Sequence, residues 1–239
     1  MTKPLHQFGR GVAVVLALAA GLGVAGYVVA TRPDSAYAHV ASIRQAEIFQ
    51  DAAELDRAWS LPVASRYRAV GLEFQGNGSL CGPTSLANLI RSTGGLASQE
   101  TILEGAGVKT YFGYLPKGLT LDALADVARR RVGAERVHVL RNLDLAAFRA
   151  AMREANDPSR RMLVNFHRGP LFGTGGGHHS PIGGYLEQED LVLVLDVNRA
   201  YQPWLVSTER LFEAVDTVDS SSGQKRGLLV IDVAGASIP

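Results

Sequence analysis

The sequence predicts an α+β domain in which a helical first half packs on a mainly antiparallel sheet. Three observations lead to this prediction. Amphipathic patterns with helical spacing dominate the chain up to residue 154, whereas short apolar or β-branched runs between Gly, Pro and charged turns dominate after residue 160. A glycine-rich loop leads Cys81 into the start of a predicted helix. The 239 residues, less an apolar N-terminal segment, suit one compact domain with one core.

The predicted helices share apolar residues three and four positions apart. Leu86, Leu89 and Ile90 follow this spacing directly after Cys81. Thr120 stands before a second such pattern, where an N-cap hydroxyl is preferred. Besides the helix after Cys81, helices are predicted over residues 45–59, 120–130, 143–154 and 207–215.

The predicted strands lie in the second half of the chain and are rich in β-branched and apolar residues. They cover residues 161–166, 179–186, 191–197 and 227–233. Residues 187–190, which are Glu, Gln, Glu and Asp, separate the second and third of these strands by a short polar turn. The turn predicts an antiparallel hairpin.

Residues 11–30 form an uncharged apolar stretch that Lys3 and Arg10 precede. This layout is typical of a signal sequence or signal anchor and predicts export. The stretch is long enough to span a bilayer, yet residues 36–38 (Ala-Tyr-Ala) resemble a cleavage site, so a cleaved signal and an anchor both remain open. A third interpretation is a buried helix of the domain. No cysteine follows the stretch at its end, which excludes lipoprotein anchoring.

The composition excludes several classes of function. The 24 Lys and Arg residues balance 23 Asp and Glu residues, and no basic run is present, so nucleic acid is not an expected partner. A single cysteine, Cys81, excludes an internal disulfide framework and a zinc site built from several thiolates. The thiol is therefore either buried packing or a chemical reagent.

The surroundings of Cys81 favour the reactive interpretation. The loop from Gln75 to Leu80 is rich in glycine and polar residues, and Pro83 lies in the first turn of the predicted helix. A thiol at a helix N-terminus lies in the positive end of the helix dipole, which favours the thiolate. Gln75 lies close enough along the chain to donate its amide beside the backbone N–H of Cys81 in an oxyanion hole. From its spacing alone, Gln75 could equally well be a solvent-exposed loop residue without a catalytic role.

A base for this nucleophile is available in His178, at the start of the predicted hairpin. The adjacent His179 should point to the opposite face of the strand, so only one of the two rings is expected to meet Cys81. The antiparallel return brings Asp196 near His178, and a carboxylate within an apolar strand requires a partner. The three side chains then form a nucleophile, a base and an orienting group. Alternatively, Asp196 caps the turn that follows its strand.

The ordered motifs resemble those of phytochelatin synthases. The resemblance rests on Cys-Gly at 81–82, Gly-His-x-Ser-Pro at 177–181, Asp-Val-x-Arg at 196–199, and Asp-Thr-Val-Asp-Ser at 216–220. It extends over about residues 70–233. Residues 118–124 (GLTLDAL) also resemble the opening of a family helix.

The resemblance implies a papain-like fold of the cysteine peptidase superfamily. It implies that Cys81, His178 and Asp196 are catalytic and that Arg199, Arg226 and Tyr201 bind substrate. The chain resembles the short bacterial forms, which lack the cysteine-rich C-terminal half of eukaryotic members. The expected division is a signal peptide or signal anchor at 1–38, a tether and packing arm at 39–68, and a phytochelatin-synthase-like catalytic domain at 69–239.

The implied reaction is cleavage of glutathione between cysteine and glycine through a γ-glutamylcysteinyl thioester, with transfer to a second glutathione giving phytochelatin. No cofactor or metal-ligating residue is expected. Cadmium and other soft metal ions enter as glutathione thiolate complexes, in heavy metal detoxification. The expected location is the periplasm, either in solution or anchored to the inner membrane through residues 11–30. The alternatives are a papain-like leader or oligopeptide peptidase, and a non-catalytic protein that binds thiol peptides or metal complexes.

Overall fold

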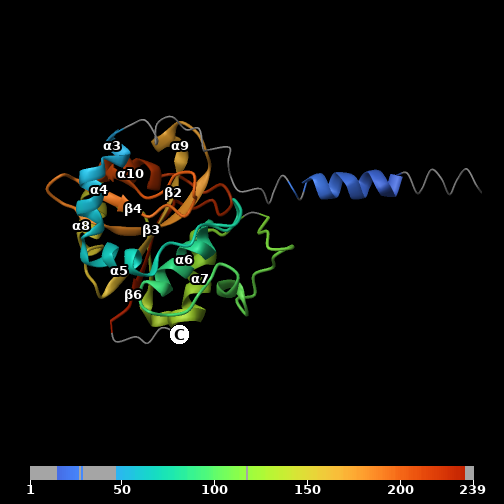
Figure 1. The fold of residues 1–239 in the computed structure, drawn as a ribbon, viewed down its shortest axis with the longest axis horizontal. Helices are drawn as coiled ribbons and strands as arrows, with labels where there is room; N and C mark the ends of the chain where they lie inside the picture. The colour runs from blue at the N-terminus through green and yellow to red at the C-terminus, as the bar shows by residue number, and fades with distance from the viewer. Residues whose placement is uncertain (1–14, 27, 29–46, 117, 235–239) are drawn as a thin grey trace, which may run out of the picture.

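The computed structural model describes residues 15–26, 28, 47–116 and 118–234 (Figure 1). Residues 15–26 are helical, with exposed side chains. Within the described residues, no helix combines the length and apolar character that crossing a membrane requires. The predicted apolar segment 11–30 lies partly outside these residues, and the cleavage motif at 36–38 lies wholly outside them.

A six-stranded sheet is the centre of the described chain, with strand order β1-β6-β2-β3-β4-β5. All neighbouring strands pair antiparallel. The register between β2 and β3 places Phe166 opposite His178 and Asn165 opposite His179. The strands are β1 (Val137–Leu140), β2 (Arg160–His167), β3 (Gly177–Leu186), β4 (Leu191–Val194), β5 (Trp204–Ser207) and β6 (Gly227–Asp232).

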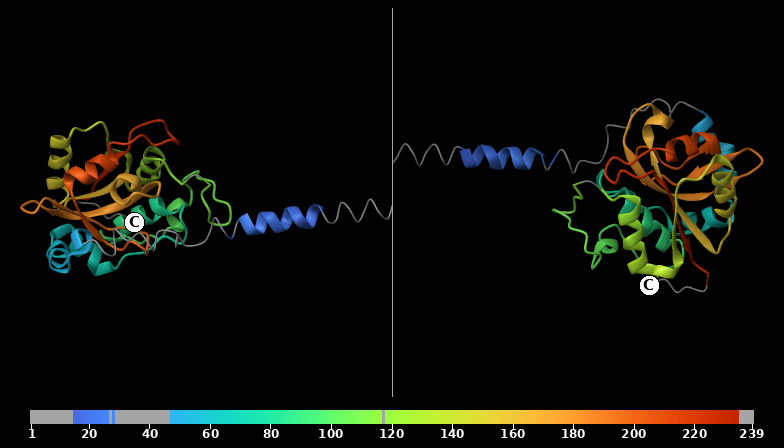
Figure 2. Two further views of the ribbon diagram at one scale, coloured as in Figure 1. Left: turned by 90° about the horizontal axis from the view of Figure 1, so that it is seen from above. Right: turned by 180° about the vertical axis from the view of Figure 1, so that it is seen from behind.

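Helices cover both faces of the sheet (Figures 1 and 2). Side-chain caps begin several of them; for example, the Thr120 hydroxyl accepts a hydrogen bond from the N–H of Ala123. The helices are α3 (Glu47–Gln50), α4 (Ala52–Trp59), α5 (Pro62–Val70), α6 (Cys81–Arg91), α7 (Leu121–Val132), α8 (Leu145–Glu154), α9 (Arg168–Phe172) and α10 (Thr208–Val215).

One face of the sheet packs against α8 and α10. Its core includes Phe148 and Leu211 from these helices and Phe166 and Trp204 from the sheet. Because side chains alternate along a strand, the residues of β2 and β3 that are adjacent in sequence to members of this core face the opposite side of the sheet. His178 therefore faces the core with Phe166, and the two rings lie 5.5 Å apart between centroids.

The other face is covered by two groups of helices. Helices α6 and α7 pack over Leu163 and Leu229. Helices α4 and α5 pack over the other end of the sheet, with Tyr67 fully buried among leucines of β3, β4 and β5. Helix α6, which begins at Cys81, thus packs on the sheet through apolar side chains. This packing fixes the position of Cys81 relative to β3.

The predicted α+β fold is confirmed, with a helical first half and an antiparallel sheet. The predicted helix 45–59 is two helices, because the side chain of Asp51 caps a new one by accepting from Glu54 N–H at 2.8 Å. Helices α5 and α9 and strands β1 and β5 were not predicted. The predicted boundary between residues 68 and 69 falls inside α5, whose buried residues belong to the same core as the sheet.

Candidate active site

Cys81 is the first residue of α6, as the loop and Pro83 predicted. Its side chain is 7% exposed, and it lies at the positive end of an 11-residue helix. The first turn of the helix is formed by a hydrogen bond of 2.9 Å that the N–H of Thr84 donates to Leu80 O. The backbone therefore presents the sulfur at the edge where α6 meets the beginning of β3.

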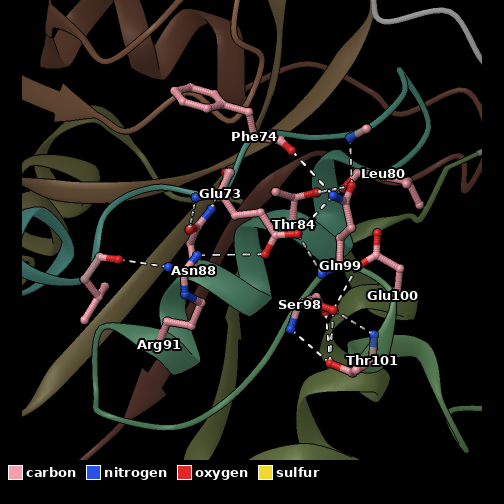
Figure 3. Close-up of polar contacts among 12 residues, drawn as sticks. Glu73, Phe74, Leu80, Thr84, Asn88, Arg91, Ser98, Gln99, Glu100 and Thr101 are labelled. Atoms are coloured by element: carbon pink, nitrogen blue, oxygen red, sulfur yellow. Dashed lines mark hydrogen bonds and ion pairs between the residues drawn. The ribbon is translucent and has the colours of Figure 1, made fainter.

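A network of amide side chains holds the loop before Cys81 (Figure 3). Asn88 exchanges two hydrogen bonds of 2.8 Å with the backbone of Glu73. The Oε1 atom of Gln99 accepts from Gly76 N–H at 2.7 Å and from the Thr84 hydroxyl at 3.3 Å. Its Nε2 atom donates to the Glu73 carboxylate at 2.9 Å. Gln99 thus ties both the loop and the first turn of α6 to one point.

A second set of hydrogen bonds fixes the part of the loop nearest the sulfur. The Asn77 side chain accepts from the backbone N–H of Ser79 at 3.0 Å and from its hydroxyl at 2.6 Å. The Ser79 hydroxyl accepts from Leu115 N–H at 2.9 Å. Both side chains are buried. The approach to Cys81 is therefore ordered by the protein itself, as preorganised catalysis requires.

His178 and Asp196 meet, as the predicted hairpin requires, although β4 ends at Val194 and Asp196 lies just beyond the strand rather than inside it. The Nε2 atom of His178 lies 3.0 Å from Oδ1 of Asp196. Asp196 is fully buried, and it also accepts from the indole N–H of Trp204 at 3.0 Å and from the backbone N–H of Asn198 at 2.8 Å. These hydrogen bonds hold the Asp196 carboxylate in place, and the carboxylate in turn fixes the orientation of the His178 imidazole.

Arg168 is the other charged partner of Asp196. Its Nη2 atom lies 2.9 and 2.8 Å from the two carboxylate oxygens, and its guanidinium carbon lies 3.7 Å from the ring centroid of Tyr201. Burial raises the pKa of Asp196, but the charges of Arg168 and His178 oppose burial and hold that pKa below its ordinary value. Asp196 is therefore a carboxylate at neutral pH.

The pKa of His178 is raised. Burial and the Arg168 charge lower it, whereas the charge and hydrogen bond of Asp196 and the hydrogen bond with Cys81 raise it. His178 is therefore biased toward the imidazolium that must accompany a Cys81 thiolate. This arrangement of charges matches that of a thiolate and imidazolium pair held by a buried carboxylate.

His179 also contacts the sulfur, contrary to the expectation that only one ring would meet it. Its Nδ1 atom lies 3.8 Å from Sγ of Cys81. The alternation of strand faces holds, with His178 on the α8 side and His179 on the α6 side. However, Cys81 lies beside the first residues of β3, where His179 contacts the sulfur directly and His178 still influences the pKa of the thiol.

The two histidines together decide the state of the thiol. Burial raises the pKa of Cys81, but the hydrogen bonds with His178 and then His179, and the charge of His178, lower it well below the ordinary value. A thiolate, rather than a thiol, is the nucleophilic form of cysteine. The lowered pKa therefore favours the thiolate form of Cys81 near neutral pH.

A cavity of about 370 Å³ opens beside Cys81 and His179. Its wall includes Asn165, Asp219 and Arg226. The Arg226 guanidinium lies 3.5 Å from an Asp219 carboxylate oxygen and 3.5 Å from the side-chain oxygen of Asn165, and Arg226 is only 6% exposed. The cavity thus presents a fixed cation and a fixed anion to a small ligand.

The other predicted site residues lie at different distances from this cavity. Gln75 donates its backbone N–H to Val197 O at 2.8 Å, and its buried Oε1 atom has no hydrogen-bond partner among the described residues. Arg199 is exposed and lies over the Phe74 ring at 4.7 Å. Tyr201 is 1% exposed in the core against Phe172 and Arg168. Of the three predicted substrate-binding residues, the structure places only Arg226 on the cavity wall.

Sequence reasoning missed Arg168, Trp204 and Asp219 as residues of the site. Arg168 and Trp204 contact Asp196 from other elements, and no local pattern marks that contact. Asp219 lay within a quoted motif, but its pairing with Arg226 depends on a loop that closes through Asp219 N–H and Gln224 O at 2.8 Å. Within the described ranges, no group of three or more His, Cys, Asp or Glu side chains is placed to hold a metal ion.

Comparisons with known proteins show which family this chain resembles in sequence. A family profile described as phytochelatin synthase matches residues 107–228. Glutathione gamma-glutamylcysteinyltransferase 1 of Arabidopsis thaliana is 46% identical over 71 residues, which are 29% of this chain and 15% of that protein. The Schizosaccharomyces pombe glutathione gamma-glutamylcysteinyltransferase is 38% identical over 72 residues, 30% of this chain and 17% of that one. The chain thus matches less than a fifth of the length of these relatives.

The solved structures that the chain matches include two described as peptidases. A putative C39-like peptidase from Bacillus anthracis gives a TM-score of 0.48 at 12% identity, covering 68% of this chain and 94% of that one. The peptidase domain of Streptococcus ComA gives 0.45 at 16% identity, covering 68% and 96%. The profile match spans just over half of the 239 residues. On that match, the chain belongs to the phytochelatin synthase family.

Proposed function

We propose that this protein cleaves glutathione between cysteine and glycine through a γ-glutamylcysteinyl thioester on Cys81. The observation that carries the proposal is a thiol with a strongly lowered pKa, flanked by the His178–Asp196 pair, beside a small cavity that holds Arg226 and Asp219. The names of the relatives support the same substrate.

The first half-reaction follows from the positions of the side chains. The Cys81 thiolate attacks the carbonyl carbon of the Cys–Gly bond, and the carbonyl oxygen becomes an oxyanion. The backbone N–H at the start of α6 and the Gln75 amide are the proposed oxyanion donors. When the tetrahedral intermediate collapses, the C–N bond breaks and the His178 imidazolium gives its proton to the leaving amine of glycine. The thioester and neutral His178 remain.

The charges of the cavity suit the γ-glutamyl end of the substrate. That end carries an α-carboxylate and an α-ammonium group close together. A guanidinium binds a carboxylate through two hydrogen bonds, so Arg226 is the proposed partner of the carboxylate. Asp219, beside it, is the proposed partner of the ammonium group. A cavity of about 370 Å³ is large enough for a tripeptide such as glutathione and too small for a long peptide.

We propose that hydrolysis outweighs transfer in the second half-reaction. Water attacks the thioester carbonyl, His178 takes the proton, and the C–S bond breaks to return the Cys81 thiolate and γ-glutamylcysteine. A second glutathione reacts with the thioester faster than water at ~55 M only where a dedicated pocket supplies an effective molarity of roughly 10⁵ M or more. Soft metal ions such as cadmium raise transfer by presenting glutathione as a thiolate complex. No resident cofactor takes part.

The test is incubation of the purified protein with millimolar glutathione, with and without cadmium, followed by mass spectrometry. Free glycine, acylated Cys81 and an excess of γ-glutamylcysteine over phytochelatin are expected. A product dominated by phytochelatin without cadmium would contradict the hydrolytic proposal. Cleavage of ordinary oligopeptides in preference to glutathione would indicate a peptidase. Binding of glutathione without acylation would indicate a non-catalytic binding protein.

We also propose an extracytoplasmic location, because Lys3 and Arg10 precede the apolar segment and bias its start toward the cytoplasm. Protease added to intact spheroplasts should therefore digest the domain, and a cytoplasmic marker protein should survive in the same sample. Survival of the domain together with the marker would contradict the proposed location.

A further inference from the structure

His179 is the side chain at the nucleophile that the proposed mechanism does not use. It is 2% exposed, and its backbone carbonyl accepts from the Ser85 hydroxyl of α6 at 3.0 Å. The Nδ1 atom faces the sulfur at 3.8 Å. The Nε2 atom is buried without a hydrogen-bond partner among the described residues. The ring is therefore held in one orientation, with Nδ1 toward Cys81 and Nε2 buried.

This environment selects a protonation state for the ring. A neutral imidazole carries one N–H, and the other nitrogen carries a lone pair. A proton on Nε2 would leave a buried donor unpaired and would turn the Nδ1 lone pair toward the thiolate. An imidazolium would bury the same unpaired donor and would add a second cation beside His178. A proton on Nδ1 alone buries no unpaired N–H and adds no second cation, and it forms a charge-assisted hydrogen bond with the sulfur; only the lone pair of Nε2 stays unpaired.

We infer that His179 is a second imidazole of the active site, a neutral ring that donates its Nδ1–H to the Cys81 thiolate. This inference rests on the proposed role of Cys81 as nucleophile. His179 does not exchange protons with substrate. It stabilises the thiolate before attack, and it stabilises the same sulfur again when the C–S bond breaks and the electron pair returns to it. His178 carries the proton in both half-reactions.

Several titratable or charged groups face the sulfur or its partners, and each enters the pH dependence. His178 and His179 approach from β3, and Asp196 and Arg168 lie behind His178. Arg226 interacts electrostatically with the thiolate across the cavity and forms an ion pair with Asp219. Tyr114 lines the same cavity. Substitution of His179 alters only the direct donor and leaves these groups in place.

The experiment is the rate of Cys81 alkylation by iodoacetamide as a function of pH, without glutathione. His179→Phe keeps a ring of similar size and removes the donor. The fraction of thiolate then falls, and the rate on the acid limb of the curve should drop about 10- to 100-fold. The plateau at higher pH should remain, because the thiolate forms there without help. A His179→Phe curve that overlays the wild-type curve would overturn the inference.

Two conservative variants distinguish a hydrogen bond from mere packing. The side-chain amide of asparagine occupies the position of Nδ1, and the amide of glutamine reaches the position of Nε2. His179→Asn should restore most of the acid limb, whereas His179→Gln should resemble His179→Phe. Restoration by glutamine and not by asparagine would show that the wrong nitrogen has been assigned.

A measurement on the wild-type protein covers the case in which the variants do not fold. Two-bond ¹H–¹⁵N correlation spectra separate protonated from unprotonated ring nitrogens. His179 should show a protonated Nδ1 and an unprotonated Nε2, and the opposite pattern would overturn the inference. Both tests are independent of turnover. Failure to release glycine from glutathione would remove the proposed function and leave the result on His179 unchanged.

Discussion

The nucleophile segment (residues 73–91) and the hairpin segment (residues 177–196) reach the same point by different means. Neutral side-chain amides and hydroxyls that bind backbone groups hold the nucleophile segment in place, with Gln99 and Asn88 at the centre (Figure 3). A buried cluster of charges holds the end of the hairpin segment, with Asp196 between Arg168 and His178. The first arrangement fixes position, and the second fixes both position and charge.

This difference follows from what each segment must supply. A nucleophile on a helix start needs a defined location, because the helix dipole and the histidines already provide the electrostatics. A base needs a defined protonation state, which a buried carboxylate supplies only if it stays ionised. Asp196 is buried, so its charge needs Arg168 as well as His178. The five predictions below test this division.

The largest expected effect is that of Cys81→Ser. The helix dipole and the histidines stabilise an alkoxide far less than a thiolate, so glycine release from glutathione should fall by ~10⁴-fold or more. Release is measured by quantifying free glycine. Retention of activity in the serine variant would point to a metal-activated water in place of the thiolate.

His178→Ala should cost ~10³-fold or more in glycine release, because the proton carrier is lost. His179→Ala should cost less than about tenfold at neutral pH, since His178 alone still supports a thiolate there. Both variants are compared at equal folded fraction by circular dichroism. Equal losses in the two variants would remove the assignment of His178 as the base.

Asp196→Asn should lower the free energy of unfolding by about 3–5 kcal/mol near neutral pH, because Arg168 is left buried without its anion. The folded-state pKa of Asp196 is depressed, so its contribution is present above the unfolded pKa of about 3.9 and is lost as the pH falls below it. The difference in stability between wild type and variant should therefore shrink below about pH 4. Urea unfolding at several pH values measures it, and a difference that stays constant down to pH 2 would contradict the ionised state.

Gln75→Ala should lower kcat about 10²- to 10³-fold with little change in KM, because an oxyanion donor acts in the transition state. The exposed Gln202 provides a matched control, and Gln202→Ala should leave both constants unchanged. A rise in KM alone would assign Gln75 to substrate binding.

The smallest effect is expected for Gln99→Ala, which releases Gly76 and Thr84 from their common acceptor. Displacement of the loop should reduce kcat about tenfold without altering the pH of half-maximal alkylation. Ser98→Ala is the control, because the Ser98 hydroxyl contacts Glu100 and Thr101 rather than the loop. A shift of the alkylation curve in Gln99→Ala would show that this network also affects the charge of the thiol.

Prediction from the sequence succeeded where the determinants are local. The position of Cys81 follows from a glycine-rich loop and Pro83, and the meeting of His178 with Asp196 follows from one hairpin. Helix α5 has a local signal in the sequence, because Pro62 is its first residue. Arg168 carried none, because it meets Asp196 only through tertiary structure.

The double contact on the sulfur shows a limit of periodicity arguments. Alternation correctly separated His178 and His179 onto opposite faces of β3. It says nothing about an atom that lies beside the end of a strand, where two faces converge. That position is set by the packing of α6 on the sheet, and this packing depends on residues far apart in sequence.

The division of the site between two segments has a consequence for the newly made chain. Before α6 docks on the sheet, Cys81 has neither histidine beside it, and its thiol has the ordinary pKa of about 8.5. Most of the sulfur is then protonated near neutral pH and reacts slowly with oxidants. The hairpin can form early because its contacts are local, whereas the docking of α6 joins distant parts of the chain and comes later. Chemical reactivity thus arises with the completed tertiary structure, and an incompletely folded chain is protected from oxidation of its single cysteine.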